Sequence, residues 1–139
     1  MYDLQRIGKT ISDIEKYLKE VESYKIKKYS DLSDSKTYNA SSMLVFAILN
    51  RTIDLGSDIL LAENLGAPNF YQDIMPLLAK GGVINKEQAE KINLLIKQRN
   101  ILAHFYEDIS EKELFNSIKS LDEIENLIKT VKKRLKIVF

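Results

Sequence analysis

The sequence predicts an all-α protein, an up-and-down bundle of four main helices with one additional short helix. Composition is the first reason, because only five Gly and two Pro occur in 139 residues, while Leu, Ile, Lys and Glu are frequent. Periodicity is the second, because apolar residues in the first and last segments recur at alternating spacings of three and four, the repeat of an amphipathic helix. A chain of this length fits one domain, so we expect residues 1–139 to form a single helical unit.

The first helix is predicted from one apolar stripe, which consists of Leu4, Ile7, Ile11, Ile14, Leu18 and Val21. The polar stretch 25–37 is then expected to be a connection. A second long helix is expected over about 38–64, and the apolar run 43–49 covers nearly all sides of its first half. Since a helix without a polar face is normally buried, we expect this helix at the centre of the bundle. The Gly66-Ala67-Pro68 sequence should end it.

A short helix is expected next, over residues 70–79. Asn69 and Gln72 form a possible capping pair at its beginning. Pro76 must start or kink a helix at this point, because proline lacks the backbone N–H of a helix interior. Gly81 and Gly82 are expected to terminate the segment.

Two further polar pairs predict where the remaining helices begin. Asn85 and Gln88 form a plausible cap for a helix that runs to about residue 106. Ser110 and Glu113 have the spacing of a capping box, so one long final helix should begin near Ser110. The apolar stripe of that helix consists of Leu114, Ile118, Leu121, Ile124, Ile128, Val131 and Leu135.

Composition also limits the chemistry. The chain has no Cys and one His, which excludes disulfides, thiolate metal sites and a multi-histidine site within one chain. Its 21 basic and 20 acidic residues leave a net charge of +1, unlike the strongly basic balance of a general polyanion binder. The longest apolar run is far shorter than the ~20 residues that span a bilayer. We therefore expect a cytoplasmic protein that does not contact a membrane.

Arg99 is the one residue that the architecture does not explain. It follows Ile92 and Ile96 at helical spacing, so it extends the apolar stripe of its helix. A guanidinium on the core side needs a paired anion, or a cleft or subunit interface that keeps it hydrated. Asp54 and Asp58, one turn apart on the second helix, could supply such an anion.

Other polar residues share the end of this helix with Arg99. Tyr106 lies within about 20° of Arg99 around the helix axis, and Asn100 and His104 stack on the adjoining face. Residue types alone favour a structural explanation, in which the His interacts with the helix dipole and the Arg pairs with a buried acid.

The spacing of these residues nevertheless resembles a known signature. Arg99-x4-His104-x-Tyr106, with Asn100 directly after the Arg, resembles the R-x4-H-x-Y motif of HepT-like toxins in the HEPN superfamily. The stretch from Asp54 through the Gly66-Ala67-Pro68 turn also looks like this family, as do the opening helix and the segment between Tyr71 and Ile84. The resemblance covers nearly the whole chain and is most specific at 99–106.

The resemblance implies a metal-independent ribonuclease without a cofactor, acting as a homodimer whose motif helices face each other across an RNA-binding cleft. Cleavage within the RNA chain is the expected mode. His104 would take the 2′-hydroxyl proton and return a proton to the 5′-oxygen leaving group. Arg99 would grip the phosphate bidentately and stabilise the added negative charge. Asn100 would position the imidazole or donate to a phosphate oxygen.

For Tyr106 the resemblance implies modification. A cognate MntA-type nucleotidyltransferase antitoxin would transfer AMP to this tyrosine, and the added charge would repel RNA. Without the family, Tyr106 would be an amphipathic residue at a helix end. Asp54 could contact Arg99 in the cleft, although we favour a buried salt bridge for it.

Two other functions fit the sequence. One is a non-catalytic helical subunit that binds substrate or nucleotide for a two-component nucleotidyltransferase, which the near-neutral charge favours. The other is a dimerisation module in which the motif is structural. The complete set of Arg99, His104 and Tyr106 favours the nuclease.

Overall fold

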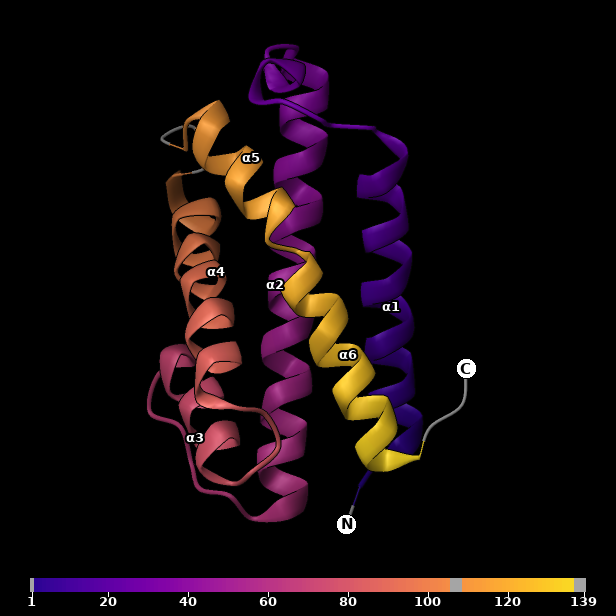
Figure 1. The fold of residues 1–139 in the computed structure, drawn as a ribbon, viewed down its shortest axis with the longest axis vertical. Helices are drawn as coiled ribbons and strands as arrows, with labels where there is room; N and C mark the ends of the chain where they lie inside the picture. Colours follow the sequence, from indigo (N-terminus) through magenta and orange to yellow (C-terminus); the bar gives the residue numbers. More distant parts are fainter. Residues whose placement is uncertain (1, 106–108, 137–139) are drawn as a thin grey trace.

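A computed structural model describes residues 2–105 and 109–136, and the side chains of His104 and Phe105 also lie outside this description. The described part contains helices and no strand, as the sequence predicts. Figure 1 shows these helices running alongside one another, with α5 and α6 crossing over the long α2. The elements are α1 (Leu4–Ser23), η1 (Tyr29–Leu32), α2 (Ser35–Glu63), η2 (Tyr71–Asp73), α3 (Ile74–Lys80), α4 (Lys86–Phe105), α5 (Glu111–Lys119) and α6 (Asp122–Leu135), where η denotes a 3-10 turn.

Helix α2 is the centre of the bundle, which confirms the prediction. It packs against α1, α3, α4 and α5, and its core positions include the fully buried Val45, Ile48 and Leu49. It begins three residues before the predicted start, because the Asp34 carboxylate caps it by accepting from the Thr37 N–H at 3.0 Å.

The C-terminal end of α2 differs in detail from the prediction. Asn64 takes a left-handed conformation, with φ of 54°, and stops the helix before Gly66. Gly66 follows with φ of 116°, which a residue with a side chain rarely adopts. The turn between α2 and α3 therefore depends on both residues.

The cap predicted for the short helix is wrong in its residues. Asp73, rather than Gln72, accepts the backbone N–H groups of Asn69 and Phe70, at 2.9 and 3.0 Å. A charged carboxylate is a stronger hydrogen-bond acceptor than an amide. Asp73 therefore provides the cap that was expected from the Asn69–Gln72 pair. Pro76 lies in the first turn of α3, where a missing N–H is tolerated.

The predicted start of α4 is confirmed. Asn85 Oδ1 accepts from the Gln88 N–H at 2.7 Å, directly before the helix. The capping box at Ser110 and Glu113 is likewise present at the beginning of α5.

The single long C-terminal helix expected from the periodicity is instead two helices, α5 and α6, which meet at Ser120 and Leu121. Local charge explains the break. Lys119 lies in the last turn of α5, and Asp122, Glu123 and Glu125 lie in the first turn of α6. These charges favour a helix C-terminus followed by a new N-terminus.

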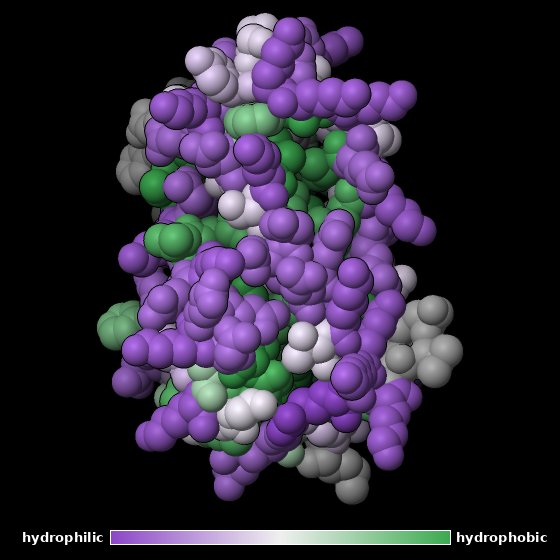
Figure 2. Space-filling model, viewed as in Figure 1, coloured by the Kyte–Doolittle hydropathy of each residue, from purple (hydrophilic) through white to green (hydrophobic). Residues whose placement is uncertain are grey.

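The face of the molecule that is turned to the viewer in Figures 1 and 2 has a predominantly polar surface. Figure 2 shows hydrophilic side chains over most of it, with apolar side chains visible in the gaps between them. None of the helices in residues 2–105 and 109–136 combines the length and the apolar composition that a bilayer crossing requires.

Candidate active site

Arg99 lies on α4 where the sequence places it, on the side that faces the rest of the bundle. Ile92 and Ile96, which precede it on the same side, are fully buried, whereas Arg99 itself is half-buried. Because α4 packs against both α2 and α3, the guanidinium reaches a region between these elements.

Two amides and two aromatic rings surround the Arg99 guanidinium. Its Nε donates to Oδ1 of Asn50 on α2 at 2.8 Å, and its Nη1 donates to Oδ1 of Asn100 at 3.2 Å. Its Cζ lies over the ring of Tyr71, 4.8 Å from the centroid, and over the ring of Phe46 at 5.5 Å. Both distances are within the range of cation–π attraction.

A carboxylate partner, one of the explanations that the sequence offers for Arg99, is not found among the described residues. Asp54 pairs with Arg51 instead, at 3.4 Å, and Asp58 pairs with Arg6 at 3.2 Å. The expectation that Asp54 is buried is also wrong, because its side chain is 50% exposed. Neutral amides and aromatic faces thus stabilise the Arg99 cation without cancelling its charge.

Asp58 has a different environment from Asp54. Burial raises the pKa of the Asp58 carboxyl above its ordinary value, and the neighbouring Arg6 opposes this only in part. Its ion pair with Arg6 joins α1 to α2 and is not part of the Arg99 site.

A cleft of about 580 Å³ opens beside Arg99. It is bordered by α1, α2, η2 and α4, through Tyr17, Met43, Phe46, Ala47, Asn50, Arg51, Ile53, Asp54, Tyr71 and Arg99. The other cation in the cleft, Arg51, lies 3.4 Å from a carboxylate oxygen of Asp13 and of Asp54. Arg99 is therefore the cleft cation that, within the described residues, has no acidic partner.

The predicted neighbours of Arg99 are only partly described. Asn100 contacts Arg99 through its amide oxygen, an interaction that the sequence reasoning did not anticipate. His104 belongs to the last turn of α4, but its side chain lies outside the described residues, and so does Tyr106 as a whole. In the described part of the chain, no three acidic or histidine side chains come together as a metal site would require.

Comparison with known proteins identifies the family. A family model described as ribonuclease HepT-like matches residues 9–131, which is most of the chain. The chain belongs to the HepT-like ribonuclease family. No curated protein matches it significantly in sequence.

Solved structures share the HepT-like fold along nearly their whole length. A chain in the crystal structure of a toxin–antitoxin with AMP-PNP is 19% identical, with a TM-score of 0.84, covering 91% of this chain and 97% of that one. YutE of Bacillus subtilis, described as a cytosolic protein of unknown function, is 22% identical, with a TM-score of 0.85 and coverages of 98% and 94%.

A third structure is that of a tri-AMPylated Shewanella oneidensis HEPN toxin in complex with MNT antitoxin. It is 20% identical to this chain, with a TM-score of 0.85 and coverages of 96% and 99%. At these identities the likeness establishes the fold of this HepT-like chain.

The sequence alone does not single out Asn50 or Phe46 as site residues, and Tyr71 enters only through the family resemblance. Asn50 did carry a signal, because it directly follows the apolar run 43–49 in the helix predicted to be most buried. A polar amide in such a place usually has a specific partner. Phe46 and Tyr71 carried no comparable signal, since aromatic residues are ordinary components of a helical core.

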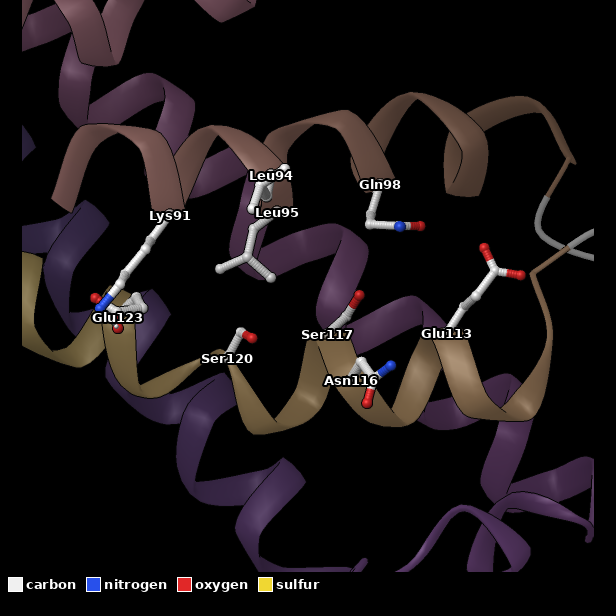
Figure 3. Close-up of a pocket in the computed structure, with 9 residues that line it drawn as sticks. All are labelled: Lys91, Leu94, Leu95, Gln98, Glu113, Asn116, Ser117, Ser120 and Glu123. Carbon is white, nitrogen blue, oxygen red and sulfur yellow. Dashed lines mark ion pairs between the residues drawn. The ribbon is translucent and has the colours of Figure 1, made fainter. Parts of the chain in front are cut away.

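A second cleft, of about 420 Å³, lies between α4 and the α5–α6 pair. Figure 3 shows Lys91 and Gln98 of α4 opposite Glu113, Ser117 and Ser120. The Lys91 ammonium is 3.7 Å from a carboxylate oxygen of Glu123 at one end of it. This cleft contains none of the site residues predicted from the HepT-like motif.

Proposed function

We propose that this HepT-like protein is a metal-independent endoribonuclease, whose RNA-cleaving cleft is shared by two copies of the chain. The observation that carries the proposal is the environment of Arg99. Its guanidinium lines a cleft, and the described residues place amides rather than acids against it, so that none of them neutralises its positive charge. The guanidinium also has N–H donors available for an oxyanion.

The proposed chemistry uses one proton acceptor and one cation. His104 removes the proton of a 2′-hydroxyl, and the 2′-oxygen attacks the adjacent phosphorus while the bond to the 5′-oxygen breaks. The departing 5′-oxygen takes a proton, which leaves a 2′,3′-cyclic phosphate and a 5′-hydroxyl end. Arg99 stabilises the extra negative charge of the transition state.

A homodimer supplies what one chain lacks. Proton removal and proton donation are best served by two imidazoles, whereas each chain has one His. Two cleft residues support a paired surface here, because Met43 is 67% exposed and Tyr71 is 44% exposed. Exposed apolar side chains beside a charged cleft are typical of a protein interface.

We further propose that the protein is the toxin of a toxin–antitoxin pair. Its fold is similar to that of a tri-AMPylated HEPN toxin in complex with MNT antitoxin. By this likeness, an MntA-type nucleotidyltransferase would neutralise it by attaching AMP to Tyr106. An AMP group adds bulk and negative charge, which would exclude an RNA backbone from the neighbouring cleft.

A second function remains in competition, a non-catalytic helical subunit that binds substrate or nucleotide for a partner nucleotidyltransferase. The net charge of +1 favours it, because RNA-binding proteins usually have a basic surface. A dimerisation module with a structural motif is the third alternative.

The deciding experiment is RNA cleavage in excess EDTA by wild-type protein and by His104→Ala and Arg99→Ala. Lys97→Ala is the control, because Lys97 is exposed on the same helix. All samples are matched for folding and dimerisation, and intact mass verifies an unmodified Tyr106. Cleavage that persists in EDTA and disappears only in the two site variants supports the nuclease. Equal background in all four samples would rule the nuclease out and favour the binding subunit.

A further inference from the structure

Asn50 occupies an unusual place for an amide. It lies near the middle of α2, the central helix, directly after the fully buried Leu49. Its side chain is half-buried, and its Oδ1 accepts the Arg99 Nε–H at 2.8 Å across the gap between α2 and α4. This is a short, charge-assisted hydrogen bond between two elements that pack against each other.

The remaining contacts of Arg99 restrict the same group. Nη1 donates to Asn100, and Cζ of the guanidinium lies over the Tyr71 and Phe46 rings. Rotation about the Nε–Cζ axis would break the bond to Asn100, and displacement of the whole group would break the bond to Asn50. Nη2 is the nitrogen that, among the described residues, has no hydrogen-bond partner.

We infer that Asn50 is a positioning residue that fixes the Arg99 guanidinium so that Nη2 is the nitrogen presented to a phosphate oxygen. The inference rests on the proposed function, since it assigns a role within the same cleft. It also changes the expectation that Arg99 binds the phosphate through two nitrogens. The edge formed by Nε and Nη2 is the usual bidentate edge of arginine, and Asn50 already occupies its Nε end.

The choice of an amide has a chemical reason. A carboxylate at position 50 would hold Nε equally well, but it would form an ion pair and cancel the charge that the phosphate must meet. An amide oxygen accepts the hydrogen bond and leaves the full positive charge on the guanidinium. Substitutions of Asn50 can therefore separate two effects on Arg99, the position of its guanidinium and the preservation of its positive charge.

The test compares Asn50→Ala and Asn50→Asp with wild-type protein in the full chain. Asn39→Ala is the matched control, an asparagine exposed on the same helix. Nitrogen-15 NMR of the Arg99 Nε–H, assigned by its loss in Arg99→Lys, reports how firmly the guanidinium is held. Steady-state cleavage of RNA in EDTA gives kcat and KM, and thermal unfolding reports the folded fraction.

We expect Asn50→Ala to accelerate exchange of the Arg99 Nε–H and to lower kcat by roughly 10- to 100-fold, with a smaller change in KM. Asn50→Asp should keep the slow Nε–H exchange and still lose kcat, because position is retained and charge is cancelled. Asn39→Ala should match wild type in both measurements.

The inference is overturned if Asn50→Ala retains the wild-type Nε–H exchange. It is equally overturned if the loss of cleavage only follows the loss of folded protein. Absence of cleavage in every sample, wild type included, would defeat the proposed nuclease alone. In that case the exchange measurement still decides whether Asn50 positions Arg99.

Discussion

Arg134 and Glu63 join the last helix to the end of the central one. Arg134 Nε donates to one carboxylate oxygen of Glu63 at 2.7 Å and Nη2 donates to the other at 2.5 Å, so the pair is bidentate. The two residues are 71 positions apart in sequence. The pair therefore ties α6, which covers the bundle, to the residue that ends α2.

This pair should give the stability a defined pH dependence. The hydrogen bonds from Arg134 lower the pKa of Glu63 below its ordinary value near 4.5. A lowered folded-state pKa contributes stability above the unfolded-state pKa, and that contribution disappears as pH falls through the lowered value. Because Arg134 is 36% exposed, water screens the ion pair. We therefore expect the pair to contribute only about 1 kcal/mol to the free energy of unfolding.

Glu63→Gln should consequently lower the free energy of unfolding at pH 7, and the loss should be smaller at pH 3. Denaturant unfolding at both values checks this, with Glu90→Gln as the control because Glu90 is exposed on α4. An equal loss at both pH values would mean that packing, rather than the ion pair, explains the effect.

The helical fold could be predicted because local pattern and tertiary packing agree. Apart from Leu4, which is 54% exposed, the stripes of α1 and α6 lie on buried or partly buried faces, and the apolar run of α2 is central. The break at Ser120 escaped prediction because the apolar spacing continues through it, while the charges that favour it lie outside the stripe. Periodicity reports which face is buried and says little about where a helix ends.

The site could be predicted only in part, for a related reason. Arg99 is conspicuous in the sequence because a charged residue occupies the next position of an apolar stripe, which is a property of its own helix. Asn50 and Tyr71 meet it from α2 and η2, and no spacing within one segment can show such a meeting. The partners of a side chain are therefore harder to predict than its position in the helix. The sequence favours a buried ion pair for Asp54 because it shows the charge of that residue but not its exposure.

A side chain at position 56 should destabilise the protein, although Gly56 lies inside α2. A methyl group there would lie 2.5 Å from Ile74 Cγ2 on α3, closer than real contacts allow. Alanine normally stabilises a helix by about 1 kcal/mol relative to glycine, but overpacking costs about 1–3 kcal/mol. We expect Gly56→Ala to lower the melting temperature.

The double variant Gly56→Ala/Ile74→Ala tests the cause of that loss. If the contact with Ile74 is responsible, the double variant loses less stability than the sum of the two single variants. Additive losses in thermal unfolding would show that the close approach of α2 and α3 is not the cause.

Arg99→Lys should abolish most of the proposed cleavage, although it keeps the charge. Lysine has no planar group to lie over the Tyr71 and Phe46 rings and no Nε–H for Asn50. We expect kcat to fall by at least about 10-fold, measured on RNA in EDTA against protein of equal folded fraction. Wild-type kcat in the variant would mean that a positive charge alone is sufficient.

Met43→Glu should dissociate the proposed homodimer without unfolding the chain. Met43 is 67% exposed at the cleft, so a carboxylate there costs little in the monomer but places two like charges at the paired surface.

Leu61→Glu is the matched control on the same helix. Leu61 is 83% exposed, and it lies 18 residues further along α2, about 27 Å at the helical rise. Sedimentation should show a monomer only for Met43→Glu, and RNA cleavage should be lost with the dimer. A dimer that survives Met43→Glu would place the paired surface elsewhere, and dissociation by Leu61→Glu instead would locate it at the opposite end of α2.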